Sequence, residues 1–341
     1  MKTIIVGGQF GDEGKGKIAS HLAISDDPEI VARGGVGPNA GHTVQFDGKK
    51  YGLRMLPCGI NNPKSKIMIG AGVAVDPEVL RKEVELTGTK GRVFVDKRCT
   101  VITKEYKEAD AGSALCEKIG TTKTGCGPAI TARAARSAKL AQDVPELKEF
   151  ITDVPAAINK AKRVLVEGSQ GFMLSVLYGT YPFVTSKDVS ASTIAADVGL
   201  GPTNVDHVIM IIKAYTTRVG NGPFKDEISI EEAKKLGFQE YGTVTGRPRR
   251  TSKDLHWDDL RLAAMINGAT QIAVTKLDVK FPGNAGVREY SKLTPESKKF
   301  IERIEKELSV PVTLIGTGPD AKDIIDRRKE LLRCEPPLKK V

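Results

Sequence analysis

The sequence is poor in cysteine and in aromatic residues, and it contains no long hydrophobic run. Its five cysteines are odd in number and show no Cys-x-x-Cys spacing, which argues against the common zinc and redox motifs and favours a reduced, cytoplasmic protein. No apolar stretch approaches the ~18 residues that span a bilayer. Met1-Lys2 leads directly into an apolar run, so we expect neither a membrane segment nor a signal peptide.

The scarcity of aromatic residues, 5% of the chain, bears on the formal net charge of +10. Nucleic-acid-binding surfaces usually combine a clustered basic stripe with stacking aromatic side chains. Here the basic residues are scattered, so we expect no nucleic-acid partner and assign the charge to a small-molecule site for several phosphates and carboxylates. Nucleic-acid binding stays open as an alternative; a gel shift at moderate salt would detect it, because nonspecific phosphate contacts weaken steeply with salt.

The chain alternates apolar β-branched runs with helical patterns, and polar loops repeatedly follow the apolar runs. Its 341 residues, 40% of them hydrophobic, can bury a large core. No repeat, low-complexity tract or linker interrupts the pattern. We therefore predict an α/β fold, one large domain over residues 1–341 around a mostly parallel central sheet, with ligands bound at the carboxyl ends of its strands.

The pattern places the individual elements as follows. Strands are expected at residues 3–6, 29–32, 51–55, 66–69, 92–95, 163–166, 181–185, 208–217, 272–275 and 310–315. Helices are expected from residue 18 onward and at residues 77–86, 105–118, 129–141, 145–160, 258–266 and 295–308, with one more closing the chain.

The first predicted strand is followed by a glycine-rich turn, Gly7-Gly8-Gln9-Phe10-Gly11-Asp12-Glu13-Gly14-Lys15-Gly16-Lys17. A turn between a strand and a helix presents backbone N–H groups at the helix start, where the helix dipole favours an anion. The spacing Gly11-x4-Gly16-Lys17 is that of a P-loop, but Ile18 stands where a P-loop has a Mg²⁺-binding Ser or Thr. We predict a variant P-loop in which Asp12 binds Mg²⁺ or accepts a proton.

Three other stretches carry candidate binding residues. Thr275-Lys276-Leu277-Asp278 resembles the [N/T]-K-x-D element of GTP-binding proteins, whose carboxylate accepts two hydrogen bonds from guanine. His42 lies in a glycine-rich loop with little core to pack against, which favours a catalytic role over a structural one. The basic stretch 243–251 interleaves Thr, Gly and Pro with arginines, which favours a shaped anion clamp over a solvated loop.

Taken together, these stretches resemble the adenylosuccinate synthetase family, with this chain as a short-form member. Segments between Arg136 and Arg163 and after Asp278 are shorter than in most of the family. The matching stretches run from end to end in the family's order: GQFGDEGKGK (8–17), NAGHT (39–43), IGTTKTGCGPA (119–129), EGSQG (167–171), GTYPFVTS (179–186), KAYTTRVGNGPF (213–224), TGRPRR (245–250), TKLD (275–278) and TGPD (317–320).

The resemblance implies the GTP-dependent ligation of L-aspartate to IMP, giving adenylosuccinate, GDP and phosphate, with one Mg²⁺ ion per subunit. Asp12 would remove the N1 proton of IMP, and the purine 6-oxygen would attack the γ-phosphate of GTP with His42 as the acid. The amine of aspartate would then displace phosphate from 6-phosphoryl-IMP. Lys15 and Gln170 would complete the catalytic set, while Asp12 and the Gly41 carbonyl would bind the metal.

The resemblance also implies three subsites and a homodimer. IMP would be bound by Asp12, Asn39, Thr122, Gln170, Thr185 and Arg247, with Arg136 acting in trans from the second subunit. Aspartate would be bound by Thr243, Val244, Thr245, Arg247 and Arg249. GTP would be bound by Gly11, Asp12, Glu13, Gly14, Lys15, Gly16, Gly41, His42, Thr43, Arg249, Lys276, Asp278, Gly316, Thr317, Gly318 and Pro319.

A GTP-binding switch protein without ligase activity is the alternative reading. The arginine clamp and the Asp12/His42 pair argue against it, because a switch needs no carboxylate-binding loop. The two readings differ in whether GTP turnover requires both IMP and aspartate.

Overall fold

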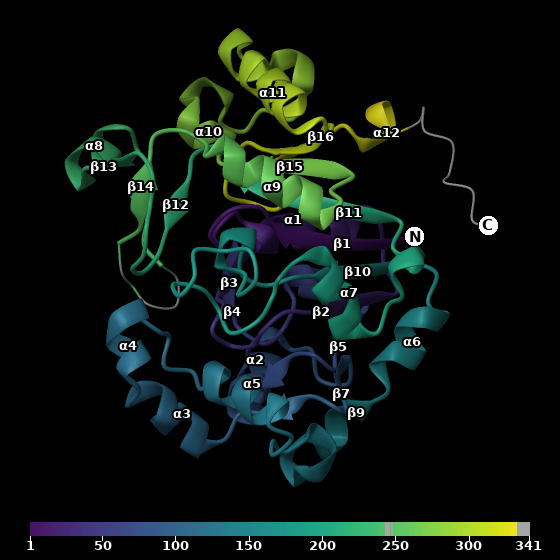
Figure 1. Cartoon of the computed structure of the whole chain (residues 1–341). Coiled ribbons are helices and arrows are strands. Elements are labelled where there is room, and N and C mark those ends of the chain that lie inside the picture. Colours follow the sequence, from purple (N-terminus) through teal and green to yellow (C-terminus); the bar gives the residue numbers. More distant parts are fainter. Residues whose placement is uncertain (243–245, 247, 333–341) are drawn as a thin grey trace.

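The computed structural model describes residues 1–242, 246 and 248–332, and its centre is a ten-stranded sheet (Figure 1). The strand order is β17-β16-β15-β11-β1-β10-β2-β5-β7-β9, and every neighbouring pair is parallel except β16 and β17. The bounds are β1 Lys2–Gly7, β2 Ile30–Arg33, β5 Lys66–Ile69, β7 Val93–Asp96, β9 Ile151–Thr152, β10 Val164–Glu167, β11 His207–Lys213, β15 Gln271–Thr275, β16 Val312–Gly316 and β17 Ile324–Asp326. The predicted α/β class with a mostly parallel sheet is confirmed.

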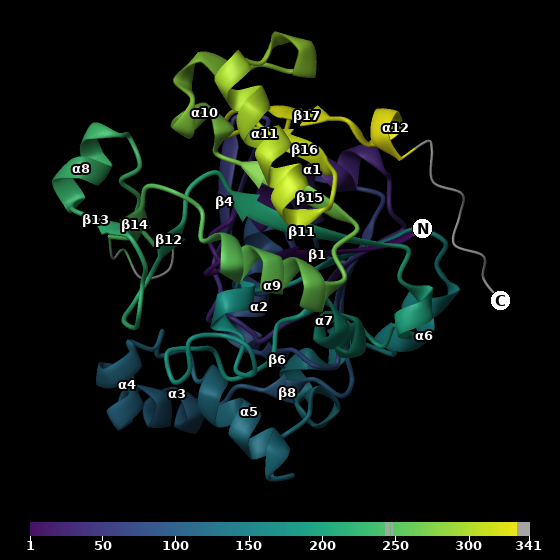
Figure 2. The same cartoon turned by 45° about the horizontal axis from the view of Figure 1, so that its top comes forward.

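Short strands form three smaller sheets beside the main one. They are the hairpin β3 His42–Phe46 with β4 Lys49–Leu53, the pair β6 Ala74–Val75 with β8 Thr100–Val101, and the set β12 Thr217–Arg218, β13 Glu227–Ile228 and β14 Arg250–Ser252. Figure 2 shows α9 and α11 over one part of the sheet, with α3, α4 and α5 gathered at the opposite end of the molecule. The helices are α1 Lys15–Ser25, α2 Pro77–Thr87, α3 Lys104–Ala111, α4 Ala114–Ile119, α5 Cys126–Ala134, α6 Val154–Lys160, α7 Ala191–Val198, α8 Ile230–Lys235, α9 Trp257–Asn267, α10 Leu277–Lys280, α11 Pro295–Leu308 and α12 Arg328–Leu331.

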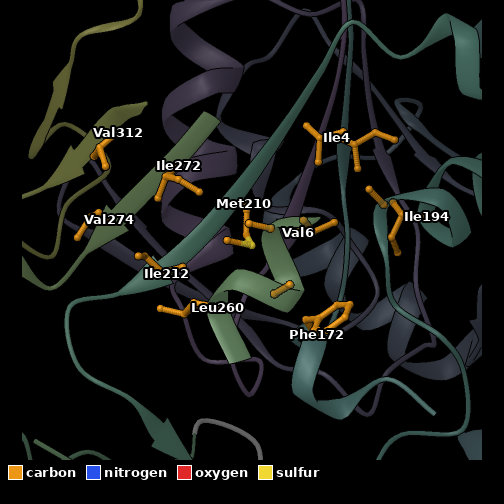
Figure 3. Close-up of a cluster of buried hydrophobic side chains, with 14 of the residues drawn as sticks. Ile4, Val6, Phe172, Ile194, Met210, Ile212, Leu260, Ile272, Val274 and Val312 are labelled. Carbon is orange, nitrogen blue, oxygen red and sulfur yellow. The ribbon is translucent and has the colours of Figure 1, made fainter. Parts of the chain in front are cut away.

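Strand β1 is apolar from Ile4 to Val6 because both faces of the sheet are covered. Ile4 and Val6 belong to one core cluster, together with Met210 of β11 and Leu260 of α9 (Figure 3). Ile5 points to the opposite face and belongs to a second cluster, which includes apolar residues of α1. The period-2 alternation of a strand thus builds a core on each side of the sheet. None of the described helices is long and apolar enough to cross a membrane.

Several predicted helices are shorter than expected. The helix expected over 105–118 is divided into α3 and α4, with Gly112 capping the first of them. The helix expected over 129–141 ends at Ala134, so Arg136 follows it with a left-handed backbone (φ +63°) and is not helical. Residues 145–160 form a 3-10 helix, the edge strand β9 and then α6, which starts after its cap residue Asp153.

Some strand predictions are wrong as well. Residues 181–185 form no strand; most of their backbone N–H groups bond within local turns, such as Phe183 N to Thr180 O at 2.9 Å. The strand expected over 208–217 ends at Lys213, and residues 217–218 belong to a separate small sheet. The stretch near 51–55 is β4 of a hairpin and lies outside the main sheet. The antiparallel edge strand β17 was not expected, because its three residues are too few to show alternation.

Candidate active site

Polar residues at the carboxyl ends of the central strands lie together at one edge of the sheet. Lys213 ends β11, Glu167 ends β10 and Lys276 directly follows β15, each at a carboxyl end beside the turn between β1 and α1. This is where ligands bind in open α/β sheets, and the strand–turn–helix order predicted for the variant P-loop is confirmed.

The turn is built around the fully buried carboxylate of Glu13. Its Oε1 atom accepts the backbone N–H groups of Gln9 (3.0 Å) and Gly11 (2.8 Å), and its Oε2 atom lies 2.7 Å from Nζ of Lys15. Lys15 is itself 3% exposed. Both side chains therefore support the turn from within, and in the ligand-free protein they use their polar groups on the turn itself.

Asp12, on the same turn, faces cations from two other segments. Its Oδ2 atom is 3.2 Å from Nζ of Lys213 and 3.2 Å from Nε of Arg249, and the Thr217 hydroxyl donates to it. Burial would raise the pKa of Asp12, but Lys213 and Arg249 together hold that pKa below its ordinary value. The second oxygen, Oδ1, is buried and has no hydrogen-bond partner among the described residues. A carboxylate oxygen left free in this way is suited to a ligand or a hard cation.

The prediction that His42 lies in a loop is wrong. It is the first residue of strand β3 and is buried. Its Nδ1–H donates to Glu167, and Nη1 of the fully buried Arg33 lies 2.5 Å from Nε2. Burial, followed by the charge of Arg33, lowers the pKa of His42 to about 4 despite Glu167. Glu167 also accepts the backbone N–H of Cys58 at 2.6 Å, so it fixes the tautomer and the orientation of the ring.

Two residues predicted to bind one ligand are brought together although 146 positions separate them. The amide of Asn39 donates to the hydroxyl of Thr185 at 3.2 Å, and its carbonyl oxygen is buried without a partner among the described residues. Gln170 is buried with a left-handed backbone (φ +55°) next to Gly11. Thr122 lies in a separate loop, where its hydroxyl is 3.0 Å from that of Thr124.

The TKLD stretch lies at the carboxyl end of β15, opposite the loop 316–319 that follows β16. Oδ1 of Asp278 is buried with no hydrogen-bond partner among the described residues, so this acceptor atom is available to a ligand. Nζ of Lys17 donates to the carbonyls of Gly318 and, at 2.8 Å, Asp323, which attaches the loop to helix α1. Burial lowers the pKa of Lys17 to about 8.

Four of the predicted residues, Thr243, Val244, Thr245 and Arg247, lie outside the described residues. Arg136 is exposed after the end of α5, and within the part of the chain that is described its side chain forms no ion pair. The other predicted positions, including Gly14, Gly16, Gly41, Thr43 and Pro319, lie on the turn, on β3 or directly before it, or at the end of β16 and in the loop after it.

Sequence reasoning missed the residues that surround the predicted ones. They are Lys17, Arg33, Glu167, Lys213, Thr217 and Glu240. Most of them lie in or beside the stretches that carried the resemblance. A buried charge at the end of an apolar strand, as at Arg33, Glu167 and Lys213, was the signal available in the sequence.

The lowered pKa of His42 predicts how its ring titrates. The folded-state value of about 4 lies below the unfolded value of ~6.5, so the unfolded chain binds a proton that the folded one does not. The stability that the neutral ring contributes is complete above ~pH 6.5 and falls as the pH drops towards 4. We expect the ring NMR signals of the ligand-free protein to stay constant from pH 8 to ~5.5.

The urea-unfolded chain is the control for this titration, with a midpoint near 6.5, and a His42→Gln variant assigns the signals. A folded-state midpoint near 6.5 would contradict the neutral ring between Arg33 and Glu167.

Comparison with known proteins gives the family. The sequence model described as adenylosuccinate synthetase matches residues 4–155 and 138–284. The chain is 58% identical to the adenylosuccinate synthetase of Archaeoglobus fulgidus, covering 97% of this chain and 99% of that one, and 54% identical to that of Methanocaldococcus jannaschii, covering 96% and 97%. The short form is thus shared with these relatives.

Solved structures agree with the sequence matches. A fully ligated adenylosuccinate synthetase from Plasmodium falciparum superimposes with a TM-score of 0.86 at 28% identity, covering 95% of this chain and 99% of that chain. A cyanophage succinoaminodeoxyadenylate synthetase, bound to dGMP and to dATP as an energy donor, gives 0.79 at 28% identity, covering 95% and 94%. The chain therefore belongs to the adenylosuccinate synthetase family of GTP-dependent ligases.

Proposed function

We propose that the site around Asp12 performs the family's reaction, the GTP-dependent ligation of L-aspartate to IMP. The observation that carries this proposal is a contact at 3.2 Å between Arg249 and Asp12. Asp12 lies on the glycine-rich turn of residues 7–17, which we call the phosphate turn. The contact supports the proposal because a proton acceptor, on the turn that we assign to the GTP phosphates, then lies next to a guanidinium that can bind a dicarboxylate. A GTP switch has no use for that neighbour, and nothing in the comparisons favours the switch.

The chemistry explains why GTP is needed. The 6-oxygen of IMP is a poor leaving group, and phosphorylation converts it into a good one before the amine of aspartate attacks. Phosphoryl transfer needs mainly positioning and charge neutralisation, which the glycine-rich turn with its lysine supplies. Asp12 accepts the N1 proton of IMP as the 6-oxygen attacks the γ-phosphate. Gln170, buried against Gly11, helps to hold the purine in this position.

The pKa of Asp12 links the binding of aspartate to the removal of the N1 proton of IMP. With Lys213 and Arg249 both in contact, the carboxylate is ionised but weakly basic. When Arg249 turns to the carboxylates of aspartate, one of the two cations leaves and Asp12 becomes a stronger base. His42 is a neutral imidazole with its proton on Nδ1, toward Glu167, so it must lose Arg33 and take up a second proton on Nε2 before it can donate to the 6-oxygen. Without Arg33, the charge of Glu167 favours that imidazolium form.

Mg²⁺ fits the residues present, since the buried Oδ1 of Asp12 is a hard ligand without another partner among the described residues. We assign one ion per subunit to Asp12 and the Gly41 carbonyl. When bound, the ion would neutralise charge on the transferred phosphoryl group.

The remaining subsites follow the family assignment. Guanine is held by Asp278, Lys276 and residues 316–319, and Lys15 lies at the phosphates. IMP is held by Asn39, Thr122, Thr185 and Arg247, with Arg136 of the partner subunit at its phosphate in a homodimer. Aspartate is held by Arg249 together with four residues that lie outside the described residues, namely Thr243, Val244, Thr245 and Arg247. The single domain, the absence of a nucleic-acid partner and the cytoplasmic location remain predictions from the sequence.

Asp12→Ala tests the proposed reaction directly. We expect ligation, followed by the absorbance change on adding aspartate to IMP, GTP and Mg²⁺, to fall by at least ~10²-fold, because a base and a metal ligand are lost together. The control Asp254→Ala removes an exposed carboxylate whose only listed-range partner is Lys280, at 3.3 Å, and should retain full rate. Activity of Asp12→Ala within a few-fold of the wild type would remove Asp12 from the mechanism.

Asp278→Asn tests how the base of the nucleotide is read. Xanthine carries an oxygen where guanine has its 2-amino donor, and an asparagine amide can donate to that oxygen. We expect the ratio of kcat/KM for XTP over GTP to rise by at least ~10-fold, since an unpaired buried polar group is costly. An unchanged ratio would show that the base is recognised elsewhere.

Mixing two inactive variants tests the homodimer. In a twofold dimer each subunit lends one Arg136 and receives one, so Asp12→Ala and Arg136→Leu should each be nearly inactive. A hybrid dimer has one intact site and one site with both lesions. With free exchange half the dimers are hybrids, and activity should recover to roughly a quarter of wild type. No recovery after verified exchange would place Arg136 outside the partner's site.

A further inference from the structure

Two acidic and two basic side chains form a closed ring beside the phosphate turn. Lys213 Nζ lies 3.2 Å from Oδ2 of Asp12 and 3.0 Å from Oε2 of Glu240. Arg249 also bridges the two acids, with Nε 3.2 Å from Asp12 and an Nη1–H that donates to Oε2 of Glu240. Asp12 and Glu240 therefore share the same pair of cations.

Glu240 also contacts residues outside this ring. Its Oε1 atom accepts the hydroxyl of Tyr215 at 2.5 Å and lies 3.6 Å from Nζ of Lys276, and its backbone carbonyl accepts the N–H of Arg249 at 2.8 Å. Burial would raise the pKa of Glu240, but Lys213, Lys276 and Arg249 hold it well below its ordinary value. One ionised carboxylate thus joins the end of β11, the residue after β15 and the segment before β14.

We propose that Glu240 is a positioning residue that sets Arg249 for aspartate and Lys276 for guanine, so that the aspartate and GTP subsites share one anchor. The inference rests on the proposed function, which supplies the roles of Arg249 and Lys276. Glu240 touches neither substrate in this scheme and acts through the two cations. No role for it followed from the sequence.

The geometry predicts unequal effects on the two subsites. Arg249, whose side chain is 14% exposed, is bonded to Glu240 by both its guanidinium and its backbone, so losing the Glu240 charge lets the guanidinium collapse onto Asp12. The side chain of Lys276 is 46% exposed and 3.6 Å away, so solvent screens most of its attraction. Aspartate binding should therefore suffer much more than GTP binding, and IMP binding should suffer least.

Glu240→Gln is the test variant, because it removes the charge and keeps the size. We expect the KM for aspartate to rise on the order of 10-fold, the KM for GTP by about 3-fold and the KM for IMP by less than about 2-fold, each with the other substrates saturating. The matched control is Glu227→Gln. Glu227 pairs with Arg250 (Nε to Oε1 2.9 Å), the residue after Arg249, and its substitution should leave all three KM values unchanged.

A double variant tests whether Glu240 acts through Arg249. Arg249→Gln alone raises the KM for aspartate, and adding Glu240→Gln to it should raise that KM no further. Equal effects of Glu240→Gln in both backgrounds would overturn the proposal, as would a fall in kcat with all three KM values unchanged, which is the signature of a merely structural role.

A charge-retaining variant covers the case in which Glu240→Gln does not fold. Glu240→Asp shortens the side chain by one methylene, and we expect the same order of KM effects at smaller size; equal changes in all three KM values would overturn the proposal. If the wild-type chain itself fails to consume GTP in the presence of IMP and aspartate, the proposed function fails; a wild-type rate with a silent Glu240→Gln overturns only the role of Glu240.

Discussion

The buried carboxylate of Glu13 determines the shape of the phosphate turn, and the rest of the site is arranged on that turn. Two backbone N–H groups and the Lys15 ammonium compensate its charge, which is the condition for burying an ion. The space it occupies has to be free of side chains: a Cβ atom at Gly7 or at Gly171 would lie 2.3 Å from one of its oxygens. Glycine in both of these stretches is thus a packing requirement, and it links the first turn to the loop after β10.

Beyond the turn, the buried charged side chains of the site form two groups, one around Asp12 and one around His42. Around Asp12 the charges alternate in a ring, so each cation is shared and none is wholly committed to one partner. Around His42 the arrangement is different, because Arg33 and Glu167 approach the same ring from two strands. Burial and the charge of Arg33 keep the imidazole neutral against the charge of Glu167. The first group thus divides its two cations between two acids, whereas the second holds the imidazole in one orientation.

Local pattern predicted much of the framework. Helix α11 was predicted with its observed bounds, because a proline at its start and a clean amphipathic period mark it. The order of β1, turn and α1 and the position of TKLD at a strand end were also readable, since both depend on neighbours in the sequence. Residues 181–185 were not, because a β-branched and aromatic run favours a strand whether or not a neighbouring strand is available to pair with it.

The environment of His42 could not be read from the sequence, for a related reason. Its partners Arg33 and Glu167 come from β2 and β10, and only the strand order of the sheet makes those two strands neighbours. The glycines that precede His42 suggested an open loop, whereas the hairpin β3–β4 folds the residue inward. Charge partners that depend on topology are invisible to a local pattern.

The attachment of Lys17 to Gly318 and Asp323 has a consequence for how the protein is made. Helix α1 leaves the ribosome early, whereas the loop that its lysine holds follows β16, which begins only at Val312. During synthesis the turn between β1 and α1 is therefore made long before the loop to which its lysine is attached. This link between the first turn and the last part of the sheet can form only when β16 and the loop after it have been translated.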